Sequence, residues 1–107
     1  MLKKGTQAPE FDLVDQDGKR HTLQSLLAKG PLILYFYPAD FTPGCTKEAC
    51  TFRDLQNDLL RAKLRVVGVS PQDADSHRKF AAKHNLNFTL LADPDKKAVK
   101  DYDVDGP

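Results

Sequence analysis

The chain places its only two cysteines five positions apart, in the stretch YPADFTPGCTKEAC that ends at Cys50. This spacing matches neither the CxxC redox motif nor the ligand spacings of zinc sites. Cys45 follows Thr42 and Pro43, which are typical of the N-cap and the first position of a helix. Because unpaired N–H groups and the helix dipole stabilise an anion in the first turn, we expect Cys45 to react as a thiolate.

The residues around Cys45 are suited to the same chemistry. Thr42 can direct its hydroxyl group toward the sulfur atom, as a hydrogen-bond donor or acceptor. Pro38 ends the preceding strand, and we expect it to wall one side of the site and to shield the thiolate from water. Gly44 has no side chain, so the backbone can come close to the molecule that the sulfur attacks.

Cys50 lies too far along a helix to bond to Cys45 directly. Five helical residues correspond to roughly 7.5 Å of rise and roughly 140° of rotation, which separates the two Cα atoms by about 8 to 9 Å. A disulfide needs a Cα separation of at most roughly 7 Å, so the first turns must unwind before the sulfur atoms meet. A sulfenic acid on Cys45 would then condense with Cys50 to a disulfide. In the alternative interpretation, both cysteines are small buried apolar residues without chemistry.

The composition describes one globular domain. Of the 107 residues, 40% are hydrophobic and 29% are charged, which supplies one modest core but not two domains. The net charge is +1 and no charged block stands out, so we predict no nucleic-acid partner. No apolar run approaches the roughly 18 residues of a membrane span, so we predict no membrane partner. The N-terminal MLKKGTQAPEF lacks an apolar signal segment, so we expect a cytoplasmic protein whose thiols are kept reduced.

The apolar pattern predicts alternating strands and helices that position the cysteine helix. In chain order we expect a hairpin over 11–23 at the front of the domain, a short helix over 23–30, a strand over 32–37, a helix from Thr42 to about Lys63, a strand over 65–70, a helix from Asp73 to about His84, a strand over 88–93, and a helix opened by Asp93 and Pro94. The run LILYFY has no alternation and predicts a central strand covered on both faces. A hairpin followed by β-α-β-α-β-α predicts an α/β domain with parallel strands, whose site lies at their carboxyl ends.

The segment YFYPADFTPGCTKEAC resembles the peroxiredoxin signature, in which a proline, three residues, a threonine, two residues and a cysteine follow one another. Its continuation TKEAC, with the second cysteine five positions on, is similar to the bacterioferritin comigratory protein, or peroxiredoxin Q, subfamily. The resemblance extends from GTQAPEFDLVDQDGKRHTL to VVGVSPQDADSHRKFAAKHNLNFTLLADPDKKAVKDYDV. It implies a thioredoxin-like fold and a thiol peroxidase that needs no metal or organic cofactor.

The resemblance also implies a role for each residue of the motif. Cys45 would be the peroxidatic cysteine that attacks the O–O bond of a hydroperoxide, and Cys50 would be the resolving cysteine of the same chain. Thr42 would hydrogen-bond to the peroxide, Pro38 would shield the thiolate, and Glu48 would orient an active-site arginine. Thioredoxin or a similar dithiol protein would reduce the disulfide, and relatives of this type would be monomers.

The chain departs from the family pattern at its C-terminal end. Peroxiredoxins use an arginine from a later strand, and they continue beyond the position that corresponds to Pro107. We expect residues 1–107 to form a single thioredoxin-like domain that lacks the family's C-terminal antiparallel strands. The strand 32–37 would then have a bare edge, which is a template for pairing. We therefore expect either a longer natural chain or an edge paired with another molecule.

Other interpretations of the sequence weigh less. A general thiol-disulfide oxidoreductase is disfavoured because the pair is not CxxC and must unwind a helix to close. A catalytically incompetent fragment or an assembly-forming piece is favoured by the missing arginine but opposed by the intact cysteine motif. Arg53 is expected to be a solvated surface charge. His21, His77 and His84 lack the spacing of metal ligands and are expected to pack partly buried or at the surface.

Overall fold

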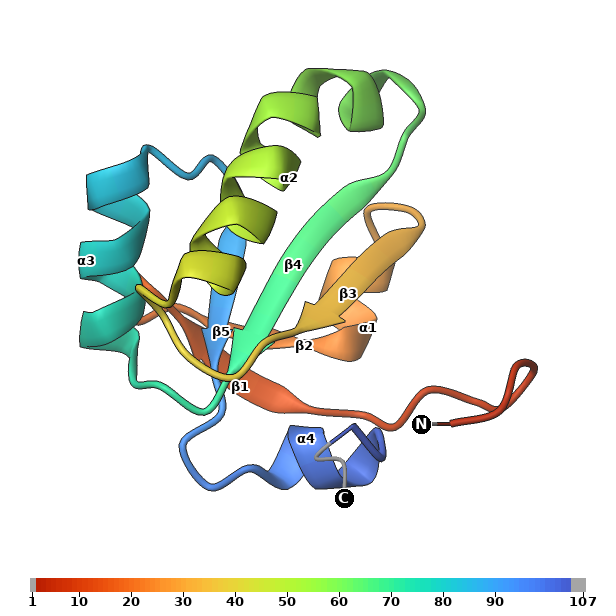
Figure 1. The fold of residues 1–107 in the computed structure, drawn as a ribbon. Coiled ribbons are helices and arrows are strands. Elements are labelled where there is room, and N and C mark those ends of the chain that lie inside the picture. Colours follow the sequence, from red (N-terminus) through yellow and green to blue (C-terminus); the bar gives the residue numbers. More distant parts are fainter. Residues whose placement is uncertain (1, 105–107) are drawn as a thin grey trace.

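The structure is a computed structural model that describes residues 2–104. Its elements in chain order are β1 (Asp12–Asp15), β2 (Arg20–Thr22), α1 (Leu23–Leu27), β3 (Leu32–Phe36), α2 (Pro43–Arg61), β4 (Arg65–Ser70), α3 (Ala74–His84), β5 (Thr89–Ala92) and α4 (Lys97–Asp101). The strands form one sheet in the order β2-β1-β5-β4-β3 (Figure 1). The predicted hairpin and the predicted β-α-β-α-β-α succession are both present.

The parallel half of the sheet has the predicted topology. Strands β3, β4 and β5 pair in parallel, with Tyr35 opposite Gly68 and Gly68 opposite Leu90. Helix α2 connects β3 to β4, and helix α3 connects β4 to β5. The carboxyl ends of these strands therefore meet at one edge of the sheet, and the chain leaves β3 toward the cysteine helix at that edge.

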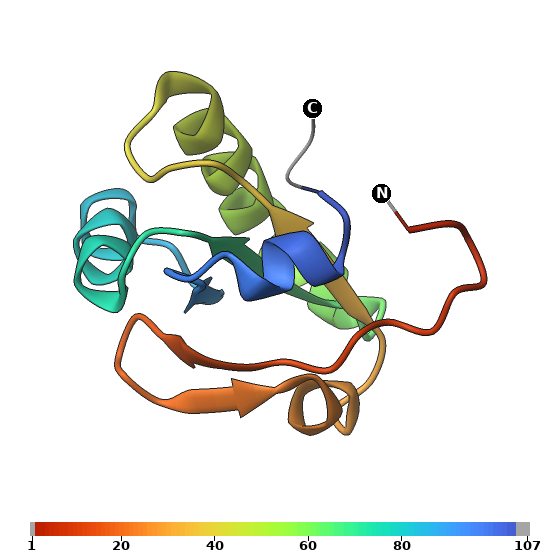
Figure 2. The same ribbon diagram turned by 90° about the horizontal axis from the view of Figure 1, so that it is seen from below.

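Helices cover both faces of the sheet. Helices α2 and α3 pack over one face, where the buried residues are Tyr37, Ala49, Val66, Phe80, Phe88 and Leu90. Helices α1 and α4 pack over the other face, where the buried residues are Phe11, Leu23, Leu26, Val67, Val69 and Leu91, with Tyr102 against them. Figure 2 shows α2 and α1 on opposite sides of the strands. Consecutive residues of β4 serve opposite faces, because side chains alternate along a strand.

Strand β3 is not the central strand that the sequence predicted. It pairs with β4 on one side, and within residues 2–104 no strand pairs with its other side. The bare edge that was predicted for a chain without the family's C-terminal strands is therefore present within these residues. Its five residues are half-buried, whereas five of the six residues of β4 are buried. An apolar run reports how much apolar surface a strand carries, but it does not report which neighbours cover that surface.

The N-terminal hairpin is part of the sheet and does not merely sit in front of it. Strand β1 pairs antiparallel with β5, which places Val14 opposite Ala92. Where β1 ends, the side chain of Gln16 continues the pairing: its amide nitrogen donates to the Phe88 carbonyl at 3.0 Å, and its oxygen accepts from the Leu90 N–H at 2.9 Å. A polar side chain thus replaces a strand residue along β5.

Helix α4 starts later than the sequence predicted. It begins at Lys97, after a turn closed by the Lys96 N–H donating to the Asp93 carbonyl at 2.9 Å. Pro94 therefore lies in the turn and not at the first helical position. The buried carboxylate of Asp93 nevertheless caps the helix, because it accepts from the N–H groups of Ala98 at 3.2 Å and Val99 at 2.9 Å.

The ring of Tyr35 lies against Gly68, which makes a stability prediction possible. A Cβ atom on Gly68 would lie 3.0 Å from two ring atoms of Tyr35 and 3.0 Å from a methyl carbon of Leu90. We expect Gly68→Ala to lower the free energy of unfolding by about 1 to 3 kcal/mol, because these packed neighbours must move. Urea unfolding measures this difference. Gly44→Ala is the control, since its Cβ would meet nothing within 4 Å; equal stability of Gly68→Ala and wild type would contradict the prediction.

Candidate active site

Helix α2 begins where the sequence predicted, and Cys45 lies in its first turn. Thr42 is the N-cap residue and Pro43 follows at the first helical position. The first helical hydrogen bond runs from the Thr46 N–H to the Thr42 carbonyl at 2.8 Å, so the amides of Gly44 and Cys45 precede the helical ladder. These unpaired amides and the positive end of the dipole of a 19-residue helix produce a positive electrostatic potential near Cys45, which favours an anion.

The hydroxyl group of Thr42 does not cap the helix. It donates to the Ala39 carbonyl at 3.3 Å, a long contact within the segment that precedes α2. The prediction that Thr42 is the N-cap is correct for its backbone, but the side chain is engaged elsewhere. At this length the hydrogen bond is weak.

Cys45 is half-buried and packs against the apolar cluster beneath α2. Tyr35, on β3, belongs to the same cluster, and its ring stacks on Phe52 at 4.7 Å and on Tyr37 at 5.5 Å. Burial is the main cause that raises the pKa of Tyr35, and the negative charges of Glu48, Asp40 and Cys45 raise it further. Its hydroxyl oxygen is buried and has no hydrogen-bond partner in the described part of the chain.

A buried polar network holds the segment between β3 and α2. Asp40 is its centre and has a fully buried side chain. Its Oδ1 accepts from the Tyr37 hydroxyl at 2.6 Å, and its Oδ2 accepts from the Ser76 hydroxyl at 2.8 Å. The same Oδ2 lies 2.7 Å from Nδ1 of His77, whose Nε2 lies 3.0 Å from the Leu91 carbonyl. The network joins the segment before α2 to α3 and β5.

Each ring nitrogen of His77 lies within hydrogen-bond distance of an oxygen atom. A carbonyl oxygen can only accept, so the contact with Leu91 requires a hydrogen on Nε2. The 2.7 Å contact between Nδ1 and Oδ2 of Asp40 requires one hydrogen shared between these two atoms. Asp40 and His77 therefore form a hydrogen-bonded pair in which both side chains are completely buried. The prediction that His77 packs partly buried or at the surface is wrong, because the residue is completely buried.

The hydrogen bonds determine the ionisation of Asp40. Burial is the largest single effect and by itself would raise the pKa of this carboxyl group. The hydrogen bonds from His77, Tyr37 and Ser76 outweigh that effect, and the pKa of Asp40 is lowered below its usual value. Burial followed by the Asp40 hydrogen bond raises the pKa of Tyr37, so its phenol remains a donor. A sequence signal for this network existed, because Asp40 interrupts an apolar stretch and His77 shares a helix face with Phe80.

Phe41 connects the network to the helix in a strained conformation. Its φ of 65° lies in the left-handed region, which costs a residue with a side chain about 1 to 2 kcal/mol. Its ring packs edge-on against Phe80 of α3, with a centroid separation of 5.2 Å. Figures 1 and 2 both show this segment bending toward α3 before α2 begins. The contacts of Asp40 and Phe41 therefore fix the point where α2 starts.

Cys50 lies on the same unbroken helix as Cys45, and both thiols are free. As predicted, the two cysteines lie on one helix and do not form a disulfide in the folded chain. Glu48 is exposed, and within residues 2–104 its carboxylate has no hydrogen-bond or ion-pair partner, so its predicted orienting role stays a prediction. Arg53 is not a free surface charge: its guanidinium donates to the His84 carbonyl at 2.6 Å and to Asp54 at 3.0 Å.

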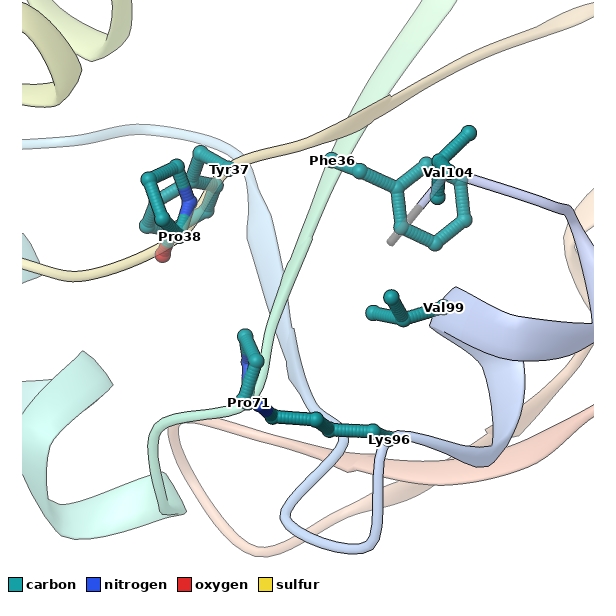
Figure 3. Close-up of a pocket in the computed structure, with 7 residues that line it drawn as sticks. All are labelled: Phe36, Tyr37, Pro38, Pro71, Lys96, Val99 and Val104. Atoms are coloured by element: carbon teal, nitrogen blue, oxygen red, sulfur yellow. The ribbon is translucent and has the colours of Figure 1, made fainter. Parts of the chain in front are cut away.

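Pro38 faces a pocket beside the cysteine segment. The pocket has a volume of about 240 Å³ and is lined by Phe36, Tyr37, Pro38, Pro71, Lys96, Val99 and Val104. Figure 3 shows Pro38 on one side of it and Phe36, Val99 and Val104 on the other. Cys45 is not among the lining residues. The shielding of the thiolate by Pro38 therefore stays a prediction.

In the region that the structure describes, no group of three or more His, Cys, Asp or Glu side chains could hold a metal ion. None of the helices within residues 2–104 is both long enough and apolar enough to cross a bilayer.

His21 contacts the buried turn carboxylate of Asp15 at 2.7 Å, so it has a structural role in the hairpin.

Comparison with solved structures defines the class of this site. The crystal structure of peroxidoxin BcpB from Mycobacterium tuberculosis matches with a TM-score of 0.94 at 38% identity, over 97% of this chain and 68% of that chain. The Xanthomonas campestris bacterioferritin comigratory protein, described for its alkyl peroxide reduction activity, matches with a TM-score of 0.83 at 35% identity, over 88% and 59% of the two chains. The fold is thus the thioredoxin-like α/β fold of the peroxiredoxins, as predicted.

The sequence comparison then gives the family. Residues 4–107 match the AhpC/TSA family, and the chain belongs to this family. Chloroplastic peroxiredoxin Q of Triticum aestivum is 50% identical over 103 residues, which are 96% of this chain and 47% of the wheat protein. The chain therefore spans about half the length of the curated relatives it matches. The prediction of a cytoplasmic protein is wrong by this comparison, because these relatives are chloroplastic.

The Asp40 network yields a prediction that depends on pH. A carboxyl group whose folded pKa is lowered stabilises the fold above its unfolded pKa, near 3.8, and loses that contribution as the pH falls through the folded value. Asp40→Asn should therefore lower the free energy of unfolding by about 2 to 4 kcal/mol at pH 7. The difference from wild type should shrink below pH 4. Urea unfolding between pH 7 and pH 3 measures both effects.

Asp58→Asn provides the control for this experiment. Asp58 also pairs with a cation, Arg61 at 3.0 Å, but its side chain is 69% exposed. Its replacement should change stability by less than about 1 kcal/mol at any pH. A pH-independent deficit in Asp40→Asn would show that the carboxylate charge does not contribute to the stability of the network.

Proposed function

We propose that this protein is a thiol-dependent peroxidase that reduces hydrogen peroxide and organic hydroperoxides. The observation that carries the proposal is the position of Cys45 in the first turn of α2, at the carboxyl end of β3, with Cys50 on the same helix. Membership of the AhpC/TSA family and the alkyl peroxide reduction activity of the Xanthomonas relative support it. The comparisons do not favour a general thiol-disulfide oxidoreductase or an inactive fragment.

The first step uses the thiolate of Cys45. Its sulfur attacks one oxygen of the hydroperoxide, the S–O bond forms as the O–O bond breaks, and the other oxygen leaves as an alcohol or as water after taking up a proton. Cys45 becomes a sulfenic acid. We assign to Thr42 a hydrogen bond to the peroxide, to Pro38 the exclusion of water, and to Glu48 the orientation of a cationic group at the site.

The second step uses Cys50. Local unwinding of α2 brings its sulfur to the sulfenic acid of Cys45, a disulfide forms and water is released. A thioredoxin-type dithiol protein then reduces the disulfide by thiol-disulfide exchange and restores both thiols. The cycle needs no metal or organic cofactor, and residues 1–107 act in it as one thioredoxin-like domain.

The two cysteines should separate the two steps of the cycle. Cys45→Ser should abolish peroxide consumption, because serine is not a comparable nucleophile at neutral pH. Cys50→Ser should keep the first turnover and accumulate sulfenic acid on Cys45, which dimedone labelling and mass spectrometry detect. The role assignment would be wrong if Cys50→Ser lost the first turnover as well.

The Thr42 hydroxyl group should matter for the first step only. Thr42→Val keeps the shape of the side chain but removes the donor, and we expect sulfenic acid formation to slow by about a hundredfold. Thr42→Ser retains the hydroxyl group and should stay within about tenfold of wild type. Stopped-flow measurement of sulfenic acid formation compares the three proteins. Equal rates in the valine and serine variants would refute a hydrogen-bonding role.

A further inference from the structure

The hydrogen bonds that tie α2 to the rest of the domain begin at Arg53. Its Nη1 donates to the His84 carbonyl at 2.6 Å, at the last residue of α3. Nearby, the Asn87 amide donates to the Arg53 carbonyl and the Gln56 amide donates to the Asn87 carbonyl, both at 3.4 Å. The short Arg53 contact is the strongest of the three, and together they hold α2 against the segment that follows α3.

The part of α2 before Arg53 is held differently. In the described structure, side-chain hydrogen bonds from residues 43–52 stay within the helix, as in the Thr51 hydroxyl donating to the Lys47 carbonyl at 2.9 Å. Ala49 and Phe52 anchor this part through apolar packing alone. The two halves of α2 therefore differ in their attachment, and the first half contains both cysteines.

Arg53 lies one helical turn after Cys50, so the two side chains share a face of the helix. The guanidinium is held in place from two directions, by His84 and by Asp54. The hydrogen bond with Asp54 is the main cause that raises the pKa of Arg53, and the negative charge of a Cys50 thiolate adds to it. The anchored cation and the Cys50 sulfur thus interact electrostatically.

Unwinding that stops at Arg53 would create a new helix start beside Cys50. The disulfide requires that residues 45–50 leave the helical conformation, since the intact helix separates the two Cα atoms by about 8 to 9 Å. The shortened helix would then expose its unpaired N–H groups close to Cys50. Its dipole and the Arg53 cation would favour the Cys50 thiolate, as the intact helix favours the Cys45 thiolate.

We propose that Arg53 is the positioning residue of the disulfide-forming step: it stops the unwinding of α2 one turn after Cys50 and favours the attacking thiolate. This inference rests on the proposed peroxidase function. The Cys50 thiolate attacks the sulfur of the Cys45 sulfenic acid, the S–S bond forms and the S–O bond breaks. The departing hydroxide combines with the proton that Cys50 released, which gives water.

Single-turnover kinetics test the role of Arg53 directly. After mixing with hydrogen peroxide, acid quenching and mass spectrometry follow the sulfenic acid and the disulfide separately. In Arg53→Met, sulfenic acid should form at the wild-type rate, while disulfide formation should slow by about three- to tenfold. Arg53→Lys keeps a cationic donor and should recover most of the rate. Arg61→Met, which removes an exposed arginine of the same helix, should behave as wild type.

Three kinetic outcomes would overturn the proposal. Disulfide formation in Arg53→Met at or above the wild-type rate would show that the residue is only a restraint on unwinding. Equal slowing of both steps would show that Arg53 supports the whole site and not the second step. If Arg53→Lys did not recover the rate of disulfide formation, the role of the anchored cation would be refuted.

Hydrogen exchange gives a readout that does not depend on peroxide. Diamide can oxidise the two thiols to the disulfide, and the amides of the oxidised protein can then be compared with those of the reduced protein. We expect α2 to lose protection before Arg53 and to keep it from residue 57 on, whose amides bond to carbonyls from Arg53 onward. In Arg53→Met the loss of amide protection should extend beyond residue 57.

The same measurement separates two kinds of failure. If no variant forms sulfenic acid with peroxide, the proposed peroxidase function fails, while the exchange boundary in the diamide-oxidised protein still tests Arg53. The boundary between unprotected and protected amides of α2 in the oxidised protein decides the anchoring role. If this boundary does not lie near Arg53 in wild type, or does not move in Arg53→Met, the anchoring role is refuted even in an active peroxidase.

Discussion

The contact between Asp40 and His77 is the interaction on which the geometry of the site depends. Both side chains are completely buried, and a buried charge is costly unless it is paired and hydrogen-bonded. Here the Asp40 carboxylate has three hydrogen-bond partners, and each ring nitrogen of His77 has an oxygen partner, so the buried polar groups are satisfied where the chain now lies. Displacing the segment after β3 would leave an unpaired charge in the core, which keeps this segment in one position.

That fixed position determines where the electrostatic field of α2 begins. Asp40 is two residues before the N-cap Thr42, and the intervening Phe41 is held in a left-handed conformation with its ring against α3. The strain at Phe41 is tolerated because the neighbouring contacts determine the backbone. The contacts of Asp40 and Phe41 therefore hold in place the unpaired N–H groups that favour the Cys45 thiolate. The helix beyond them is held by apolar packing until Arg53, so the start of α2 is fixed while the following turns can open.

The sequence predicted those features that depend on neighbours along the chain. The apolar runs gave the strands β3, β4 and β5 within one or two residues, and the Thr42-Pro43 pair gave the start of the cysteine helix. Features that depend on distant partners were missed. The pairing of β1 with β5 and the Asp40–His77 contact across 37 residues both require knowledge of which elements meet. The delayed start of α4 was missed for a related reason, since Asp93 caps that helix across an intervening turn.

The five-residue spacing of the cysteines now has a structural explanation that involves both sides of α2. Ala49 and Phe52, four and seven positions after Cys45, are packed with it over the sheet, so this cysteine faces Tyr35 and Tyr37. Cys50 is rotated by roughly 140° from Cys45 and lies instead on the side of Arg53. A spacing of four would place the second sulfur on the same face and nearly within bonding distance of the first. The extra residue keeps the resolving thiol away from the reactive one in the intact helix, and unwinding of the loosely attached half is then the event that brings them together.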